Sequence, residues 1–184
     1  MKVCNVDTLE FVGWGETNMV MIPKNGPTGS QHPKWFSNNG NQWCYTAHGD
    51  PEELDALVEA VSNTLYESLK YYNPTDFPRM RELAVDIADN RNGCTCDGCV
   101  ASMNKYGGAH SAAAVQFLNR VAQNVREWFN QPENEQYRRE DFHINFLGYL
   151  HMTKAPTFYD ESTGEYKPYD DSVICDPMLK VVLA

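Results

Sequence analysis

The chain has 184 residues, of which 42% are hydrophobic and 12% aromatic, so it is long and apolar enough for one domain with a substantial core. Its formal net charge of -10 argues against nucleic acid or an anionic membrane as a partner, since both require a basic protein surface. Neutral, hydroxyl-rich ligands such as sugars are allowed, and aromatic side chains suit them because sugar faces stack on rings.

The sequence also bears on location. No apolar stretch approaches the roughly 20 residues needed to span a bilayer, and the N-terminus lacks the apolar core of a signal peptide. Taken literally, this predicts a cytoplasmic protein without membrane insertion. The chain starts almost directly in an apolar stretch, however, and stops inside residues 179–184, which are expected to form a buried strand. Such ends are typical of a piece of a longer protein, which would be extracellular or at the cell surface if it is secreted.

The first half of the chain predicts two strands and a helix. Short strands are expected at 10–15 and 42–46, on either side of a polar loop. Asp50-Pro-Glu-Glu53 predicts a helix start, with Asp50 as N-cap, Pro51 at the first position and Glu53 as the capping-box acid. Apolar residues then recur at helical spacing to about Tyr72. They are Leu54, Leu57, Val58, Val61, Leu65 and Leu69.

The second half continues the alternation. Residues 83–87 have the length and composition of a buried parallel strand, and the loop that follows carries three cysteines. Ser111 is expected to cap a second long helix, whose buried face is formed by Val115, Leu118, Val121, Ala122, Val125 and Trp128. A strand at 142–150, a polar loop at 153–170 that turns at Gly164, and a strand at 179–184 complete the chain. The order predicts an α/β fold built from parallel βαβ units, in a single domain spanning 1–184.

Cys94, Cys96 and Cys99 lie within six positions of one loop. This spacing can wrap a tetrahedral zinc ion if a fourth ligand arrives, and Cys44, His48 and His110 are candidates for that place. A disulfide between two of the three is a second interpretation, natural in a secreted protein, and packed reduced thiols are a third. The sequence leaves the three open.

Polar residues also follow the predicted strands, where ligands of parallel α/β proteins bind. Asp89 and Asn90 come directly after the strand at 83–87; their alternative role is to cap a turn with side-chain hydrogen bonds. His48 and Tyr149 follow two other strands and could each bond a ligand, or else bond backbone and trim the core. Trp14, between two glycines, is a candidate stacking surface.

A set of motifs along the whole chain resembles one bacterial family, the domain of unknown function numbered 4838. These motifs are His32-Pro-Lys-Trp-Phe36, Gln42-Trp-Cys-Tyr-Thr-Ala-His-Gly-Asp50, Asp89-Asn90 with Cys94-x-Cys96-x-x-Cys99, and Phe142-x-Ile-x-Phe-x-x-Tyr149 with Ala155-Pro156. That family is similar to glycoside hydrolase barrels of the α-glucuronidase and β-hexosaminidase type. The resemblance implies a partial (β/α)8 barrel, the central portion of a domain that needs roughly 250 residues, within a longer chain that carries further domains.

The resemblance also implies roles for residues. Related barrels carry an Asp-Glu pair at the end of the fourth strand, with the Glu as catalytic acid, whereas this chain has Asp89-Asn90. An amide cannot deliver a proton, so Asp89 would bind or polarise the sugar and Glu16 is the reserve acid. Asn90, His48, Tyr149 and Trp14 would line the pocket. Two functions follow: a glycoside hydrolase-like domain that acts on a glycan or polysaccharide, or a non-catalytic carbohydrate-binding or scaffolding module that has lost the acid.

Overall fold

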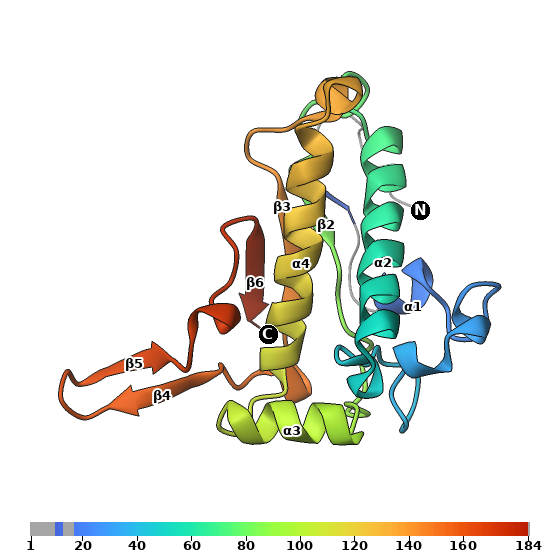
Figure 1. Cartoon of the computed structure of the whole chain (residues 1–184). Coiled ribbons are helices and arrows are strands. Elements are labelled where there is room, and N and C mark those ends of the chain that lie inside the picture. Colours follow the sequence, from blue (N-terminus) through green and yellow to red (C-terminus); the bar gives the residue numbers. More distant parts are fainter. Residues whose placement is uncertain (1–9, 13–16, 184) are drawn as a thin grey trace.

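The computed structural model describes residues 10–12 and 17–183. It shows a four-stranded parallel sheet in the order β1-β2-β3-β6, with two long helices on one face (Figure 1). The strands are β1 (Phe11–Val12), β2 (Glu82–Ala84), β3 (His143–Gly148) and β6 (Leu179–Leu183). Helix α2 (Pro51–Tyr71) connects β1 to β2, and α4 (Ser111–Phe129) connects β2 to β3. The α/β fold with parallel βαβ units is therefore confirmed. The described strands form an open sheet, and no closed barrel is seen in this part of the chain.

The two long helices pack side by side over the sheet, as their sequence periodicity predicts (Figure 1). Asp50 caps α2 by accepting hydrogen bonds from the backbone N–H groups of Glu52 and Glu53. The apolar positions predicted for α4 are all buried, and those of α2 are buried except for the half-buried Leu54. Burial of these stripes, worth about 1.5–3 kcal/mol for each large side chain, is the main reason that both helices form. None of the described helices is long and apolar enough to cross a membrane.

The caps at both helices differ in detail from the prediction. Glu53 does not close a capping box; its carboxylate lies 2.9 Å from Nδ1 of His32, which draws it away from the helix end. The N-cap of α4 is His110, and the hydroxyl of Ser111 donates to the carbonyl of Lys154 instead. The side chains of Glu53 and Ser111, which the sequence predicts to cap helices, instead bond residues that are distant in the sequence.

Successive side chains of the strands face two different environments. In β3, Ile144 and Phe146 join the core beneath the helices. Asn145 lies between them in sequence and faces the other side, where its amide donates to Glu82 at 2.6 Å and Lys180 also bonds Glu82. The face away from the helices therefore carries a partly buried polar network. In β6, predicted to be buried, Leu183 is 78% exposed, because the strand lies at the edge of the described sheet.

Two segments fold differently from their predictions. Residues 42–46 are not a strand: they make one isolated bridge, between Trp43 and Phe36, and then enter a 3₁₀ turn at Ala47–Gly49 whose positive φ angles end any extended run. Residues 153–170 are not a plain loop but contain the hairpin of β4 (Thr157–Asp160) and β5 (Glu165–Pro168). Gly164 lies at its turn, as predicted, with φ of 73°. The hairpin projects from the body of the molecule (Figure 1).

Candidate functional site

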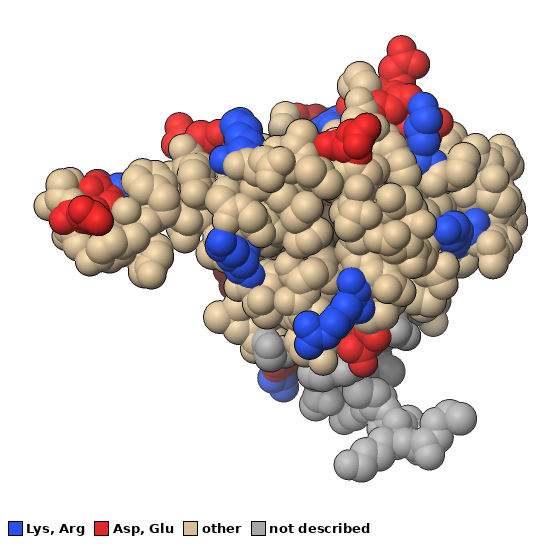
Figure 2. Space-filling view, turned by 90° about the horizontal axis from the view of Figure 1, so that it is seen from below, with Lys and Arg blue, Asp and Glu red and all other residues tan. Residues whose placement is uncertain are grey.

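The carboxyl ends of the parallel strands meet at one end of the molecule, where several loops gather. A helix that the sequence did not predict, α3 (Asp97–Lys105), lies across this end (Figure 1). Figure 2 looks at the molecule from this side and shows a surface made mostly of uncharged residues, with charged side chains scattered singly or in small groups. The candidate functional residues lie in the loops of this strand-end face.

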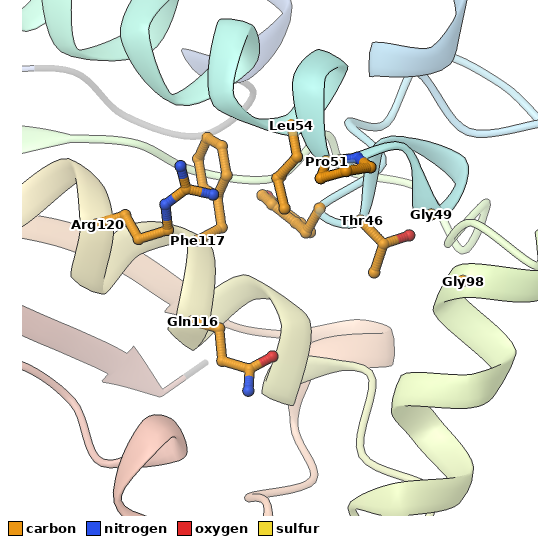
Figure 3. Close-up of a pocket in the computed structure, with 9 residues that line it drawn as sticks. Thr46, Gly49, Pro51, Leu54, Gly98, Gln116, Phe117 and Arg120 are labelled. Atoms are coloured by element: carbon orange, nitrogen blue, oxygen red, sulfur yellow. The ribbon is translucent and has the colours of Figure 1, made fainter.

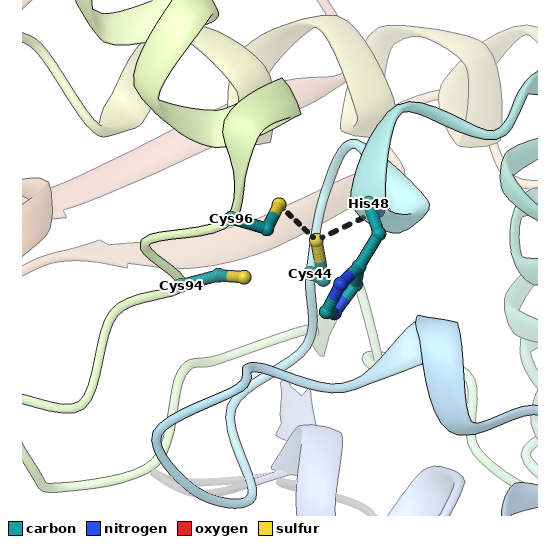
Figure 4. Close-up of side chains that lie close together, drawn as sticks. All are labelled: Cys44, His48, Cys94 and Cys96. Carbon is teal, nitrogen blue, oxygen red and sulfur yellow. Dashed lines mark hydrogen bonds between the residues drawn. The ribbon is translucent and has the colours of Figure 1, made fainter.

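Four cysteines from two distant segments come together here. The Sγ atom of Cys44 lies 3.6 Å from that of Cys96 and 3.6 Å from that of Cys99. Cys94 belongs to the same group, and its sulfur lies within 4.8 Å of those of Cys44 and Cys96. Cys44, Cys94 and Cys99 are buried and Cys96 is half-buried. In Figure 4, Cys94 and Cys96 extend from the loop that leads into α3 toward Cys44. We call these four residues the cysteine cluster.

Local backbone geometry presents Cys44 to the other three. The N–H of Cys44 donates to the carbonyl of Trp35 at 2.8 Å, which fixes the segment against the preceding loop. The chain then turns through Ala47 and His48, both with positive φ, so that the N–H of His48 points back to Sγ of Cys44 at 3.2 Å. Such strained conformations in non-glycine residues persist only where the surroundings enforce them. The turn and the cluster therefore form one unit.

The other three cysteines are placed by the start of α3. Cys96 is the N-cap residue of this helix and Cys99 lies in its first turn. Gly98 lets the helix approach the turn around Cys44, because a Cβ atom there would lie 2.8 Å from the Gly49 backbone nitrogen and 2.8 Å from the Thr46 hydroxyl. The spacing Cys-x-Cys-x-x-Cys thus converts one loop and one helical turn into three sulfur positions.

The cysteine cluster does not contain a disulfide. All described cysteines are free, and the 3.6 Å separations far exceed the roughly 2.05 Å of an S–S bond. In the thiol form, a hydrogen bond with Cys94 and burial raise the pKa of Cys44 to about 11, against the opposing bond from Cys99. Hydrogen bonds with Cys44 and Cys99 lower the pKa of Cys94.

Of the candidate fourth ligands, Cys44 and His48 reach the loop cysteines. One ring nitrogen of His48 and the sulfurs of Cys44, Cys94 and Cys96 all lie within 4.8 Å of one another. Nε2 of His48 also lies 2.8 Å from the carbonyl oxygen of Phe36, to which it donates. The structure thus shows a group of cysteine and histidine side chains at metal-binding distance. Its members come from residues 44–48, which include part of the predicted second strand, and from the loop after β2.

The hydroxyl of Thr46 is a member of this site that the sequence did not single out. Its Oγ1 lies 3.2 Å from Sγ of Cys99, 3.4 Å from Sγ of Cys44 and 3.7 Å from Sγ of Cys96. An O–H donor at these distances stabilises thiolate charge. In the sequence, only its position two residues after Cys44 connects Thr46 with the site. That position points to a role only when the four cysteines are known to lie together.

Asp89 and Asn90, the residues first expected to bind a ligand, differ in their surroundings. Asp89 is exposed at the carboxyl end of the segment that continues β2. The side chain of Asn90 accepts the backbone N–H of Asn92 at 3.0 Å, so it caps the turn. Beneath it, the buried Gln42 donates to the carbonyl of Ala88 at 2.7 Å and also approaches Asn90. Gln42, not recognised from sequence as a site residue, positions this turn.

The remaining predicted residues are not brought into the cysteine cluster. Tyr149 is half-buried and packs against the core, in agreement with its structural alternative. Trp14 and Glu16 lie outside the described residues. His110, the remaining candidate metal ligand, instead contacts His151: the two rings meet edge to face, with their centroids 5.5 Å apart. Burial lowers the pKa of His151 to about 4, so this ring is neutral at physiological pH.

A pocket of about 280 Å³ lies behind the cysteine cluster, between the start of α2, α3 and α4 (Figure 3). Its walls are mainly apolar, with Leu54 and Phe117 facing the space and Thr46 and Gly98 at the side of the cluster. Arg120 at its rim is paired with Asp55 at 2.6 Å. This pocket lies on the helix side of the sheet, so it is separate from the strand-end face that carries Asp89.

The fold and the site together define a parallel α/β domain with a cysteine cluster at the strand ends. A family model described as Domain of unknown function (DUF4838) matches residues 5–161, and the chain belongs to this family. No curated protein and no solved structure gave a significant match.

Proposed function

We propose that the chain is part of a glycoside hydrolase-like barrel domain that binds or acts on carbohydrate at the strand-end face. The observation that carries this proposal is the exposed carboxylate of Asp89 at the carboxyl end of a parallel strand, the place where barrel enzymes put their catalytic groups. The strand β2 ends at Ala84, and the buried residues 85–88 lead from it to Asp89.

Two features of the fold support the barrel. The helices cover one face of the parallel sheet, as in the outer ring of a (β/α)8 barrel. The other face carries the buried amide of Asn145 and the ion pair of Lys180 with Glu82, which is the kind of polar interior that a curved sheet could enclose. The described strands would then be the central units, completed by further segments of a longer protein with other domains.

One observation favours the non-catalytic alternative, a carbohydrate-binding or scaffolding module. Asn90 stands where related barrels keep the acidic Glu, and its side chain is already used by the turn, through Asn92 and Gln42. An amide supplies no proton to a leaving sugar, so catalysis would need an acid such as Glu16. Binding of a neutral glycan needs no such acid.

A comparison of two matched variants tests this function. The full-length protein, Asp89→Asn and the control Glu59→Gln, an exposed residue of α2, are screened with chromogenic glycosides and a glycan array. Turnover that falls at least about 100-fold in Asp89→Asn and persists in the control supports the enzyme. Glycan binding without turnover, weakened by Asp89→Asn, supports the module. If the full-length protein shows no turnover and binds no glycan, the proposal is contradicted.

We also propose that the cysteine cluster binds a structural zinc ion. Thiolates are favoured zinc ligands, and closed sites of this kind hold loops in place and leave no position open for substrate. Cys94 and Cys96 fit this role because their sulfurs lie within 4.8 Å of Cys44 and of a ring nitrogen of His48, and Cys99 lies 3.6 Å from Cys44. Elemental analysis of protein purified without chelator tests it: one zinc per chain is expected, and a metal-free protein contradicts it.

A further inference from the structure

We infer that the metal is held by four sulfurs, those of Cys44, Cys94, Cys96 and Cys99, and that His48 lies outside the coordination sphere. The inference rests on the proposed structural zinc and adds its ligand set and its mechanical role. The centre would join the segment before α2 to the segment after β2 and thereby set the shape of the strand-end face.

The separations of the sulfurs carry the first step. A tetrahedral zinc with Zn–S bonds of about 2.3 Å places its sulfurs about 3.8 Å apart. Cys44 lies 3.6 Å from Cys96 and 3.6 Å from Cys99, and the sulfurs of Cys44, Cys94 and Cys96 lie within 4.8 Å of one another. The four sulfurs thus form one compact group around Cys44, whose two shortest separations are close to those that the ion requires.

The second step distinguishes Cys99 from His48 as the remaining ligand. Sγ of Cys99 is buried and at tetrahedral distance from Sγ of Cys44. His48 contributes to the group in another way, through its backbone N–H, which donates to Cys44 at 3.2 Å, while its imidazole bonds the carbonyl of Phe36. The hydrogen bond from this backbone N–H to a cluster sulfur is an outer-shell interaction. A ring nitrogen of His48 also lies within 4.8 Å of three of the sulfurs, so X-ray absorption must decide between this nitrogen and Cys99.

The third step concerns charge, because four thiolates around Zn²⁺ leave two negative charges in a buried place. Donors that compensate them surround the cluster. The hydroxyl of Thr46 faces three of the sulfurs, and the backbone N–H of His48 donates to Cys44. The first turn of α3 also begins at Cys96, so its helix dipole favours negative charge there. The surroundings therefore suit an anionic four-sulfur centre.

The mechanical role follows from which segments the sulfurs connect. Cys44 lies before α2, and the other three lie between β2 and the first turn of α3, so the centre closes a chain loop of about fifty residues. Apart from the sulfurs, the two segments meet at Gly98, close to the Gly49 backbone, and through hydrogen bonds of residues 37–42 with residues 88–95. We expect metal removal to loosen residues 36–49 and 89–99 while the α2–α4 core stays folded.

X-ray absorption spectroscopy of the wild type and zinc-binding measurements on three variants test the ligand set. Zinc-edge X-ray absorption of the wild type should show four sulfur neighbours at about 2.3 Å and no nitrogen at about 2.0 Å. Cys99→Ser should weaken zinc binding more than about 100-fold, beyond the range typical of outer-shell changes. His48→Asn should bind zinc within about tenfold of the wild type, since Asn tolerates the positive φ at this position. Cys175→Ser, which removes a cysteine outside the cluster, should bind it unchanged.

The outcomes separate this inference from the proposed zinc itself. Zinc surrounded by three sulfurs and one nitrogen, with zinc lost in His48→Asn, overturns the four-sulfur set and leaves the structural metal standing. A wild type without zinc overturns both. If Cys99→Ser does not fold, the absorption spectrum of the wild type still decides between the two ligand sets.

Discussion

Sγ of Cys44 and Sγ of Cys99 lie 3.6 Å apart although 55 positions separate them in the sequence. The contact joins the turn before α2 to the first turn of α3. It lies at the strand-end face, on which Asp89 is also exposed. The proposed metal centre and the candidate carbohydrate site are therefore neighbours in the fold, and we expect the stability of the first to bear on the shape of the second.

Removal of the metal is expected to lower thermal stability. Because a structural metal binds the folded state and not the unfolded chain, its loss should cost about 3 kcal/mol, or roughly 6–12 °C in Tm for a domain of this size. Scanning calorimetry with and without a chelator measures the effect. Cys44→Ser should start at the lower Tm and not respond to chelator, and Cys175→Ser should respond like the wild type. An unchanged wild-type Tm would count against a stabilising metal.

Gly98→Ala is expected to destabilise the protein by about 2 kcal/mol. The added Cβ would lie 2.8 Å from the Gly49 backbone nitrogen, and backbone cannot give way as a flexible side chain does. Denaturant unfolding measures the change. Val100→Ala, at an exposed position of the same helix, should change stability by less than about 0.5 kcal/mol. Equal stability of both variants would show that α3 does not press against the turn around Cys44.

Arg139 is a buried residue that we predict to be essential for stability at the opposite end of the sheet. Its guanidinium donates to the carbonyls of Met80 and Tyr72 at 2.6 Å each and to that of Phe77 at 2.9 Å. A lysine cannot reproduce this fork, so Arg139→Lys should lower the free energy of unfolding by about 2–3 kcal/mol.

The neighbouring Arg138 is exposed and gives a matched control. Arg138→Lys should leave unfolding within about 0.5 kcal/mol of the wild type. If Arg139→Lys unfolds at the same denaturant concentration as Arg138→Lys, the carbonyl contacts of Arg139 contribute nothing measurable.

The neutral ring of His151 predicts a dependence of stability on pH. Burial, and secondarily the charge of His110, lower its pKa to about 4 in the folded protein, below the 6.5 of an unfolded chain. The unfolded state then binds the extra proton between pH 6.5 and 4, so stability falls as pH decreases through this window. We expect His151 to contribute a loss of about 2 kcal/mol between pH 7 and pH 5.

Unfolding curves of the wild type and His151→Asn at these two pH values isolate that contribution. Whatever difference in packing separates the two proteins at pH 7, the wild type should lose about 2 kcal/mol more stability than His151→Asn between pH 7 and pH 5. Parallel pH profiles for the two proteins would show that His151 titrates normally.

The long helices were predictable from sequence because their buried residues recur at every third or fourth position. In the stripe from Val115 to Trp128 these positions are all apolar. The strands around Leu83 and Ile144 were found for a similar reason, as short apolar runs beneath those helices. The helix α3 was missed because its residues pack little of their surface into the main core. Its glycine and cysteines favoured a loop.

The site was predictable only in part. Three cysteines stand together in the sequence, but the contact of Cys44 with them depends on how the chain folds back, which spacing alone does not encode. Asn90 could be assigned to a turn or a ligand from its residue type, and the choice required its partner, the N–H of Asn92. The hairpin around Gly164 was hidden because its aromatic and polar residues are exposed on both faces, without the alternation of a half-buried strand.

The most direct test of the four-sulfur centre is a count of reactive thiols in the native protein before and after a chelator is added. The chain has 6 cysteines, of which the cluster holds Cys44, Cys94, Cys96 and Cys99. We predict that chelation releases one zinc and makes four further thiols reactive per chain. A thiol count that chelation does not change, in a protein that releases no metal, would contradict the account.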